Sequence, residues 1–206
     1  MGIQERKLRE KEALRQRILE AARDIYLREG PDALSIRKVA RAIEYSPGTI
    51  YLHYRDKDDL LLELHRDAFR RKGGLFGPLM SITDPVARLE AMGRAYIHHA
   101  LENAADFHLM FVDECPISRM VETGEEWTNG DTVMDMLRNT IQQGIDQGSM
   151  RPDIVPETMT VILWSLVHGC ATLLTGTRLS MVVDDLTPQQ IQDNLFDQMH
   201  RILSNG

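Results

Sequence analysis

Apolar residues at helical spacing, each series opened or closed by a capping residue, run through the first third of this sequence. Ile18, Ala21 and Ile25 recur at the period of an α-helix, and Gly30-Pro31 ends the series. This period places apolar side chains on one face of a helix, whereas a half-buried strand would need strict alternation. Similar patterns continue along the chain, so the sequence predicts an all-α protein of about nine helices.

Three further helices follow within a short distance. Ser35 is a good N-cap for a second helix, and Ser46-Pro47 opens a third that runs to about Tyr54. Asp56 is expected to cap a fourth, longer helix. Two short helices joined by a tight turn, with a longer helix on either side, form the layout of a helix-turn-helix.

The charge is unevenly distributed between the two parts of the chain. The formal net charge is −7, but residues 1–72 carry 17 Lys and Arg against 13 Asp and Glu. The remaining residues carry 7 against 18, which gives +4 for the first part and −11 for the second. Opposite charges in the two parts suggest two tasks, with a polyanionic partner for the first.

Residues 34–60 resemble the DNA-binding signature of the TetR family of transcriptional regulators. They contain Leu-Ser-Ile-Arg-Lys-Val-Ala at 34–40 and Ser-Pro-Gly-Thr-Ile-Tyr at 46–51, followed by Tyr54, Lys57 and Leu60. The resemblance implies a three-helix helix-turn-helix DNA-binding domain over residues 12–72, with its motif at 35–54. It also implies a repressor that binds double-stranded operator DNA.

The turn of the motif departs from the family pattern. The family usually has Ala-Gly-Val there, and this chain has Ile43-Glu44-Tyr45. If Glu44 keeps the left-handed conformation that glycine favours, the cost is on the order of 1 kcal/mol. Otherwise the turn adopts a different backbone conformation.

The resemblance assigns roles to residues of the motif. Thr49 would face a base edge or a thymine methyl group, and Tyr51 and His53 would reach phosphates. Lys57 would contact the DNA backbone. We expect Arg37 to pair bidentately with a guanine. The full set expected at DNA is Ser35, Arg37, Lys38, Ser46, Pro47, Gly48, Thr49, Tyr51, His53 and Lys57.

Two charged features of the first part of the chain have alternative interpretations. Lys38 could instead be an ordinary solvated charge. The basic run Arg6, Lys7, Arg9 and Lys11 is either a disordered arm that strengthens non-specific DNA binding or a solvated helix face.

The acidic part is predicted to form a second domain over residues 84–203. Asp84 opens a helix that reaches about Asn103, and a short apolar helix at 107–114 ends before Pro116. Residues 123–130 are expected to be a polar loop. Another helix should span 132–147.

Residues 158–177 contain no charged side chain and are long enough to span a bilayer. We favour a deeply buried helix instead, and we expect no membrane association. Trp164, His168 and Gly169 are similar to the Trp…His-Gly motif of one TetR C-terminal subgroup. The resemblance implies a homodimer through this helix and the last one, which Thr187 opens with a capping box.

A small-molecule effector is expected to bind among the middle helices. Taken singly, each candidate residue is more often ordinary core, because Met and aromatic residues at helical spacing usually just pack. The weakly polar, methionine-rich lining favours a mostly apolar ligand. The candidate ligand-binding residues are Tyr96, His99, Met110, Phe111, Met134, Leu137, Trp164 and His168.

No signature of catalysis or of cofactor binding is present. The chain lacks HExxH, Gly-x-Ser-x-Gly and a phosphate-binding loop, so we predict no catalytic residues, no cofactor and no metal. Cys115 and Cys170 have no metal-ligand spacing and are expected to be reduced in a cytoplasmic protein. A metal-sensing repressor and, more remotely, a helical enzyme are the alternatives.

Overall fold

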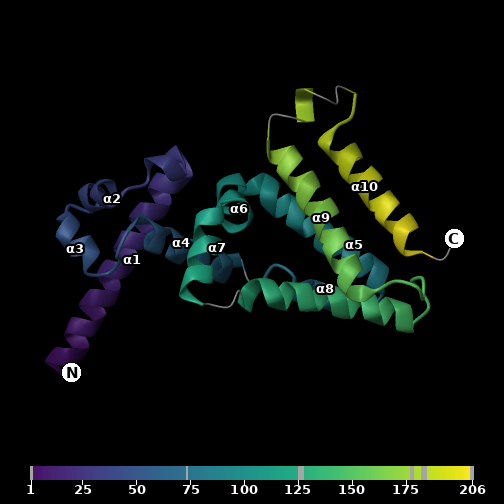
Figure 1. Cartoon of the computed structure of the whole chain (residues 1–206), viewed down its shortest axis with the longest axis horizontal. Helices are drawn as coiled ribbons and strands as arrows, with labels where there is room; N and C mark the ends of the chain where they lie inside the picture. Colours follow the sequence, from purple (N-terminus) through teal and green to yellow (C-terminus); the bar gives the residue numbers. More distant parts are fainter. Residues whose placement is uncertain (1, 73, 125–127, 177–178, 182–184, 205–206) are drawn as a thin grey trace. The chain divides into compact units, whose positions relative to one another are not determined.

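The computed structural model describes residues 2–72, 74–124, 128–176, 179–181 and 185–204. Over these residues it contains ten α-helices, three short 3-10 helices and no strand, which confirms the all-α prediction (Figure 1). The chain forms two compact units. The first comprises residues 1–71 and 105–126, and the second comprises residues 72–104 and 127–206.

The first unit is built on a long N-terminal helix. Its elements are α1 (Ile3–Glu29), η1 (Pro31–Ala33), α2 (Ile36–Ala42), α3 (Pro47–Tyr51), α4 (Lys57–Lys72), α6 (Ala104–Phe111) and α7 (Glu114–Thr123). Ile18, Val39, Ile50 and Leu60 are fully buried and come from α1, α2, α3 and α4 in turn. Each helix therefore buries one apolar stripe against the others.

The caps form where the sequence places them. Ser35 Oγ accepts a hydrogen bond from the backbone N–H of Lys38 at 3.3 Å, and Asp56 Oδ1 accepts one from Asp59 at 2.8 Å. Gly30 ends α1 with φ of 83° and ψ of 173°, so it has the positive φ of a glycine stop without the full left-handed geometry. The third helix ends at Tyr51, three residues earlier than expected.

Glu44 has a φ of 62°, the single positive φ outside glycine in the described part of the chain. The turn thus keeps the left-handed backbone, and Glu44 occupies a conformation that glycine adopts more easily. Its N–H donates to Arg41 O at 3.2 Å. The helix-turn-helix geometry is preserved at a local conformational cost.

Helices α6 and α7 differ from the prediction. We expected Pro116 to end a helix, but it lies buried in the first turn of α7, which Asp113 caps. Proline is tolerated there because first-turn N–H groups have no partner within the helix. The predicted loop at 123–130 is correspondingly shorter, and its residues 125–127 lie outside the described residues. Both helices also belong to the first compact unit, although their residues fall in the predicted 84–203 domain.

The second unit is a bundle of α5 (Pro85–Glu102), α8 (Thr128–Asp146), α9 (Pro156–Thr175) and α10 (Pro188–Leu203), with η2 (Gly77–Ser81) and η3 (Leu179–Met181). Helix α9 packs against α5, α8 and α10, as Figure 1 shows for α9 beside α10. Gly93 lets α5 approach α10 closely, because a Cβ added at this position would lie 2.6 Å from Phe196 Cε1 of α10. Thr187 forms the predicted capping box at the start of α10.

Helix α9 is long and apolar enough to cross a membrane, with a mean hydropathy of 1.5 over its best window. Length and composition are weak grounds by themselves, since core helices of globular proteins meet the same test. Leu163, Val167 and Ala171 are buried within the bundle.

Candidate nucleic-acid interface and effector site

The short helix α3 presents one face to the core and the other to solvent. Ile50 is fully buried, whereas the neighbouring Tyr51 side chain is 56% exposed and Thr49 is half-buried. Pro47 and Gly48 are exposed at the start of the helix. Because Ile50 fixes the rotation of α3, its small N-terminal residues form an outward surface that can approach another molecule closely.

Ser46 fixes the start of this surface. Its Oγ accepts the backbone N–H of Thr49 at 3.2 Å and lies 3.0 Å from Thr49 Oγ1. The cap therefore holds the Thr49 hydroxyl in place. Pro47 occupies the first helical position, where its missing N–H costs no hydrogen bond.

Two of the predicted DNA-contacting lysines have partners within the protein. Lys38 Nζ forms an ion pair with Glu29 at the end of α1. Lys57 Nζ donates to Pro31 O at 2.7 Å, so its ammonium group bridges the start of α4 and η1. Ser35, the N-cap residue of α2, and Arg37, in its first turn, are both exposed.

His53 lies just after α3, close to two cations of α1. Its side chain is half-buried. Burial lowers the pKa of His53, and the positive charges of Lys11 and Arg15 lower it further. The imidazole is thus favoured in its neutral form, which can still donate one hydrogen bond.

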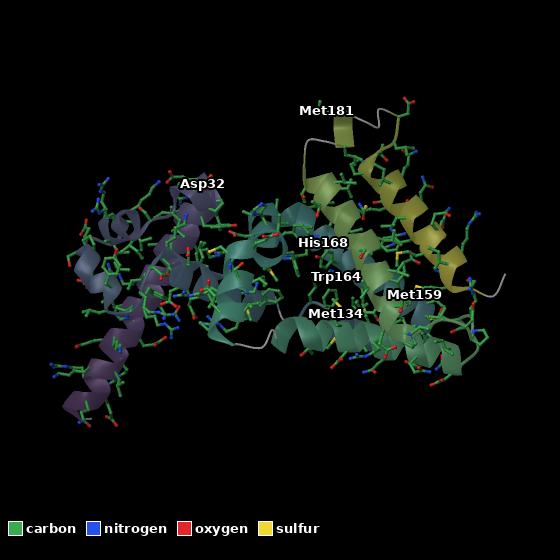
Figure 2. The ribbon with its side chains drawn as sticks, in the orientation of Figure 1. Asp32, Met134, Met159, Trp164, His168 and Met181 are labelled. Carbon is green, nitrogen blue, oxygen red and sulfur yellow. The ribbon has the colours of Figure 1, made fainter. Side chains whose placement is uncertain are left out.

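Three of the predicted effector residues meet in the second unit. The Tyr96 hydroxyl of α5 lies 2.9 Å from His168 Nδ1 of α9, and the Trp164 and His168 rings are 5.9 Å apart. Figure 2 labels Trp164 and His168 on successive turns of α9, and Met134 on α8. Burial raises the pKa of Tyr96 and lowers that of His168, so both groups are neutral near pH 7.

The remaining predicted effector residues are distributed over both units. Met134 and Leu137 are half-buried on α8, and His99 is buried on α5 within hydrogen-bonding distance of Asn103. Met110 and Phe111 lie on α6 of the first unit, where the Phe111 ring packs 5.5 Å from that of Phe69. The structure therefore groups Tyr96, Trp164 and His168, and it assigns Met110 and Phe111 to a different unit.

A buried ionic cluster in the first unit was not predicted from the sequence. Asp106 of α6 is 3% exposed, and its Oδ2 lies 3.3 Å from Arg23 Nη2 of α1 and 3.7 Å from Arg71 Nη1 of α4. The Tyr26 hydroxyl, also on α1, lies 3.4 Å from His108 Nδ1. An aspartate inside the mostly apolar 104–111 segment was the available signal.

Two family models match this chain. Residues 18–64 match the model described as bacterial regulatory proteins of the tetR family, and residues 89–201 match the tetracyclin repressor-like C-terminal domain. Together these matches span the helix-turn-helix and most of the second unit.

The chain belongs to the TetR family.

Curated TetR-family relatives cover most of its length. An HTH-type transcriptional repressor of Mycobacterium tuberculosis is 31% identical over 84% of this chain and 90% of its own. The HTH-type transcriptional repressor AcnR of Corynebacterium glutamicum is 27% identical over 82% of this chain and 88% of its own.

Solved structures share the TetR fold. A protein from Rhodococcus sp. RHA1 superposes with a TM-score of 0.74 at 23% identity, covering 93% of this chain and 96% of its own. AibR, solved in complex with isovaleryl coenzyme A and operator DNA, gives a TM-score of 0.60 at 20% identity, covering 88% and 95%.

Membership of this family establishes the class of function. TetR-family proteins are DNA-binding transcriptional regulators, not enzymes, and they act as dimers that bind operator DNA and small-molecule effectors. The prediction of a regulator of this family is confirmed.

Proposed function

We propose that this protein represses transcription by placing α3 of each protomer in the major groove of its operator. The observation that carries the proposal is the rotation of α3, which buries Ile50 and turns Pro47, Gly48, Thr49 and Tyr51 outward. Small residues at the start of a recognition helix permit close approach to base edges. The repressor names of its relatives support the direction of regulation.

Individual contacts follow from these positions. We assign Thr49 to a base edge or thymine methyl group, Tyr51 and His53 to phosphates, and Arg37 to a guanine. Lys38 and Lys57 would contact the DNA backbone. To do so, Lys38 would leave Glu29, and Lys57 would leave the carbonyl oxygen of Pro31, for phosphate oxygens. The neutral His53 would donate a hydrogen bond to its phosphate.

A homodimer through α9 and α10 is supported by an uncovered apolar face. Ile162, Leu166 and Leu173 are 39%, 36% and 47% exposed, and Gly169 has open space where a Cβ would stand. Their spacing places all four on one side of α9, opposite the buried Leu163, Val167 and Ala171. A second protomer would cover this face. It would also supply the second recognition helix that a two-half-site operator needs.

We place the effector site at Tyr96, Trp164 and His168 in the second unit. Two aromatic rings and an imidazole, all neutral near pH 7, suit a mostly apolar molecule that carries one hydrogen-bonding group. The Tyr96–His168 hydrogen bond provides an oriented donor and acceptor for that group. AibR, a structural neighbour, was solved with isovaleryl coenzyme A, an apolar acyl chain on a polar carrier.

The chain itself provides a route from effector to DNA. Helix α5, which carries Tyr96, is followed after Asn103 by α6, which carries Asp106. Asp106 in turn contacts Arg23 of α1 and Arg71 of α4. A shift of α5 on effector binding would therefore act on the helices that support α3. Allosteric coupling of this kind is typically worth about 1–3 kcal/mol. Because a repressor acts on chromosomal DNA, we place it in the cytoplasm.

Selection of bound DNA from a fragmented genome tests the proposed function. We expect the wild-type protein to enrich a small set of fragments that share an inverted repeat, with half-sites about one helical turn apart or a multiple of it. The Thr49→Ala/Tyr51→Ala double variant should enrich none of them. Equal enrichment by both proteins would contradict the proposed role of α3.

A further inference from the structure

The N-terminal half of α1, residues 4–17, lies outside the part of the chain that matches the family model. That match begins at residue 18, whereas α1 begins at Ile3 and continues without interruption to Glu29. Figure 1 shows this half extending past α3 toward the N-terminus. It is a helix and not a disordered arm.

This half of α1 is attached to the turn of the helix-turn-helix and to α4. The Arg17 guanidinium donates to Ile43 O at 3.4 Å and lies 5.5 Å from the centre of the Tyr45 ring, at the turn of the motif. Arg15 Nη2 forms an ion pair with Glu63 Oε2 of α4 at 3.0 Å. The direction of the helix relative to α3 is therefore fixed by the protein.

Lysines continue the inward-facing stripe of α1 beyond the core. Lys7 and Lys11 are one turn apart and share the face that carries Ile18 and Ile25 in the other half of the helix. Both lysines are exposed, and neither ammonium group forms an ion pair with any described residue. We call Lys7 and Lys11 the lysine face.

Arg6 and Arg9 lie away from the lysine face and are engaged along the helix, whereas Arg15 follows Lys11 by one turn and pairs with α4. Arg6 Nε pairs with Glu10 at 3.4 Å, and Arg9 Nε donates to Glu5 O at 3.4 Å. The two arginines lie on the opposite side of the helix from the lysines. The positive charge of the lysine face is therefore not neutralised on its own surface.

The lysine face lies on the same side of the first unit as the end of the recognition helix. His53, which follows α3, is close enough to Lys11 and Arg15 for both cations to lower its pKa. Lys11 lies one helical turn before Arg15, whose guanidinium pairs with Glu63 of α4, and Lys7 lies one turn further along α1. Glu12 of α1 is also close enough to His53 to raise its pKa, so one carboxylate accompanies these cations.

We propose that the lysine face of α1 is a second DNA-binding surface, which binds the sugar-phosphate backbone flanking the half-site that α3 reads. This inference rests on the proposed function of α3. It adds a sequence-independent contact made by a rigid helix. Ammonium groups without protein partners can pair with phosphates and release counterions from DNA.

The test compares variants of matched charge on the two sides of one helix. Lys7→Gln/Lys11→Gln removes the lysine face, and Arg6→Gln/Arg9→Gln removes the same charge from the opposite side. Each full-length protein is titrated by fluorescence anisotropy over a range of KCl concentrations. The probes are the duplex selected by the wild-type protein, trimmed to its core, and the same duplex with one helical turn of random sequence added at each end.

On the extended duplex, we expect the lysine variant to flatten the slope of log K against log salt by about 2–4 in a dimer, at ~0.9 for each lost phosphate contact. The arginine control should change this slope by less than about 1. A Lys7→Arg/Lys11→Arg variant should restore it. On the trimmed duplex, wild type and lysine variant should differ little.

Three results would overturn the inference. If the lysine variant and the control flatten the slope equally, only general charge is involved. If neither changes it while Thr49→Ala/Tyr51→Ala still abolishes selective binding, the proposed function stands and the second surface does not exist. If the wild-type protein selects no duplex, both proposals fail.

Discussion

The Asp106 carboxylate of α6 lies 3.3 Å from the Arg23 guanidinium of α1, joining residues far apart in the chain across the interior of the first unit. The carboxylate is almost fully buried, whereas Arg23 and Arg71 retain about a third of their side-chain exposure. Removing one partner of a buried pair leaves a desolvated charge behind, which costs more than the pair contributes.

Asp106→Asn should therefore lower the free energy of unfolding by about 1–3 kcal/mol, with partial exposure of the arginines keeping the loss below that of a fully buried pair. Asp135→Asn, which breaks an exposed pair with Arg138 on α8, should cost less than about 0.5 kcal/mol. Urea denaturation measures both. Equal effects of the two substitutions would show that the ion pairs of Asp106 contribute no more to stability than an exposed pair does.

Glu44→Gly should stabilise the protein by about 0.5–1 kcal/mol, because the left-handed φ of 62° strains every residue except glycine. Glu44→Ala should leave stability nearly unchanged, since alanine keeps the strain. Thermal and urea unfolding of the two variants distinguish them. A glycine variant no more stable than the alanine variant would mean that the turn relaxes around Glu44.

His65 should make stability fall as the pH is lowered. Burial lowers its pKa from 6.5 to about 4 in the folded protein, and its ring lies 4.8 Å from that of Phe69. Because the unfolded chain binds the proton more tightly, stability from this group is full above pH 6.5 and is lost progressively down to about pH 4.

We expect His65→Phe to remove about 2–3 kcal/mol of that pH dependence. The measurement is urea denaturation of both proteins at several pH values between 4 and 7. Parallel stability curves for wild type and variant over that window would show that His65 is not the titrating group.

Leu166→Arg should separate the dimer, because it places a charge in the middle of the uncovered face of α9. Analytical ultracentrifugation should give the monomer mass, and operator affinity should fall by about 100-fold or more as two-site binding is lost. Val121→Arg is a matched control on the exposed surface of α7. If Leu166→Arg stays dimeric, the interface lies elsewhere.

The sequence predicted features that depend on near neighbours. The caps at Ser35, Ser46 and Thr187 formed as expected, since each needs only an oxygen and an N–H two or three residues ahead. Proline was interpreted wrongly at Pro116, because the same residue that stops a helix also fits its first turn.

Features that depend on distant partners could not be predicted from sequence pattern. The pairing of Asp106 with Arg23 requires the fold, as do the partners that hold Lys38 and Lys57. The grouping of Tyr96 with His168 also depends on how α5 packs against α9. The sequence pattern indicated both residues as candidates but did not predict that they would form a hydrogen bond with each other.

Anisotropy titration of a labelled duplex from beside the protein's own gene tests whether the outward face of α3 reads operator DNA. We expect saturable binding that outcompetes a random duplex, decreases linearly on a log–log salt plot, and is lost in the correctly folded Thr49→Ala/Tyr51→Ala variant. Undiminished selective binding by that variant would contradict it.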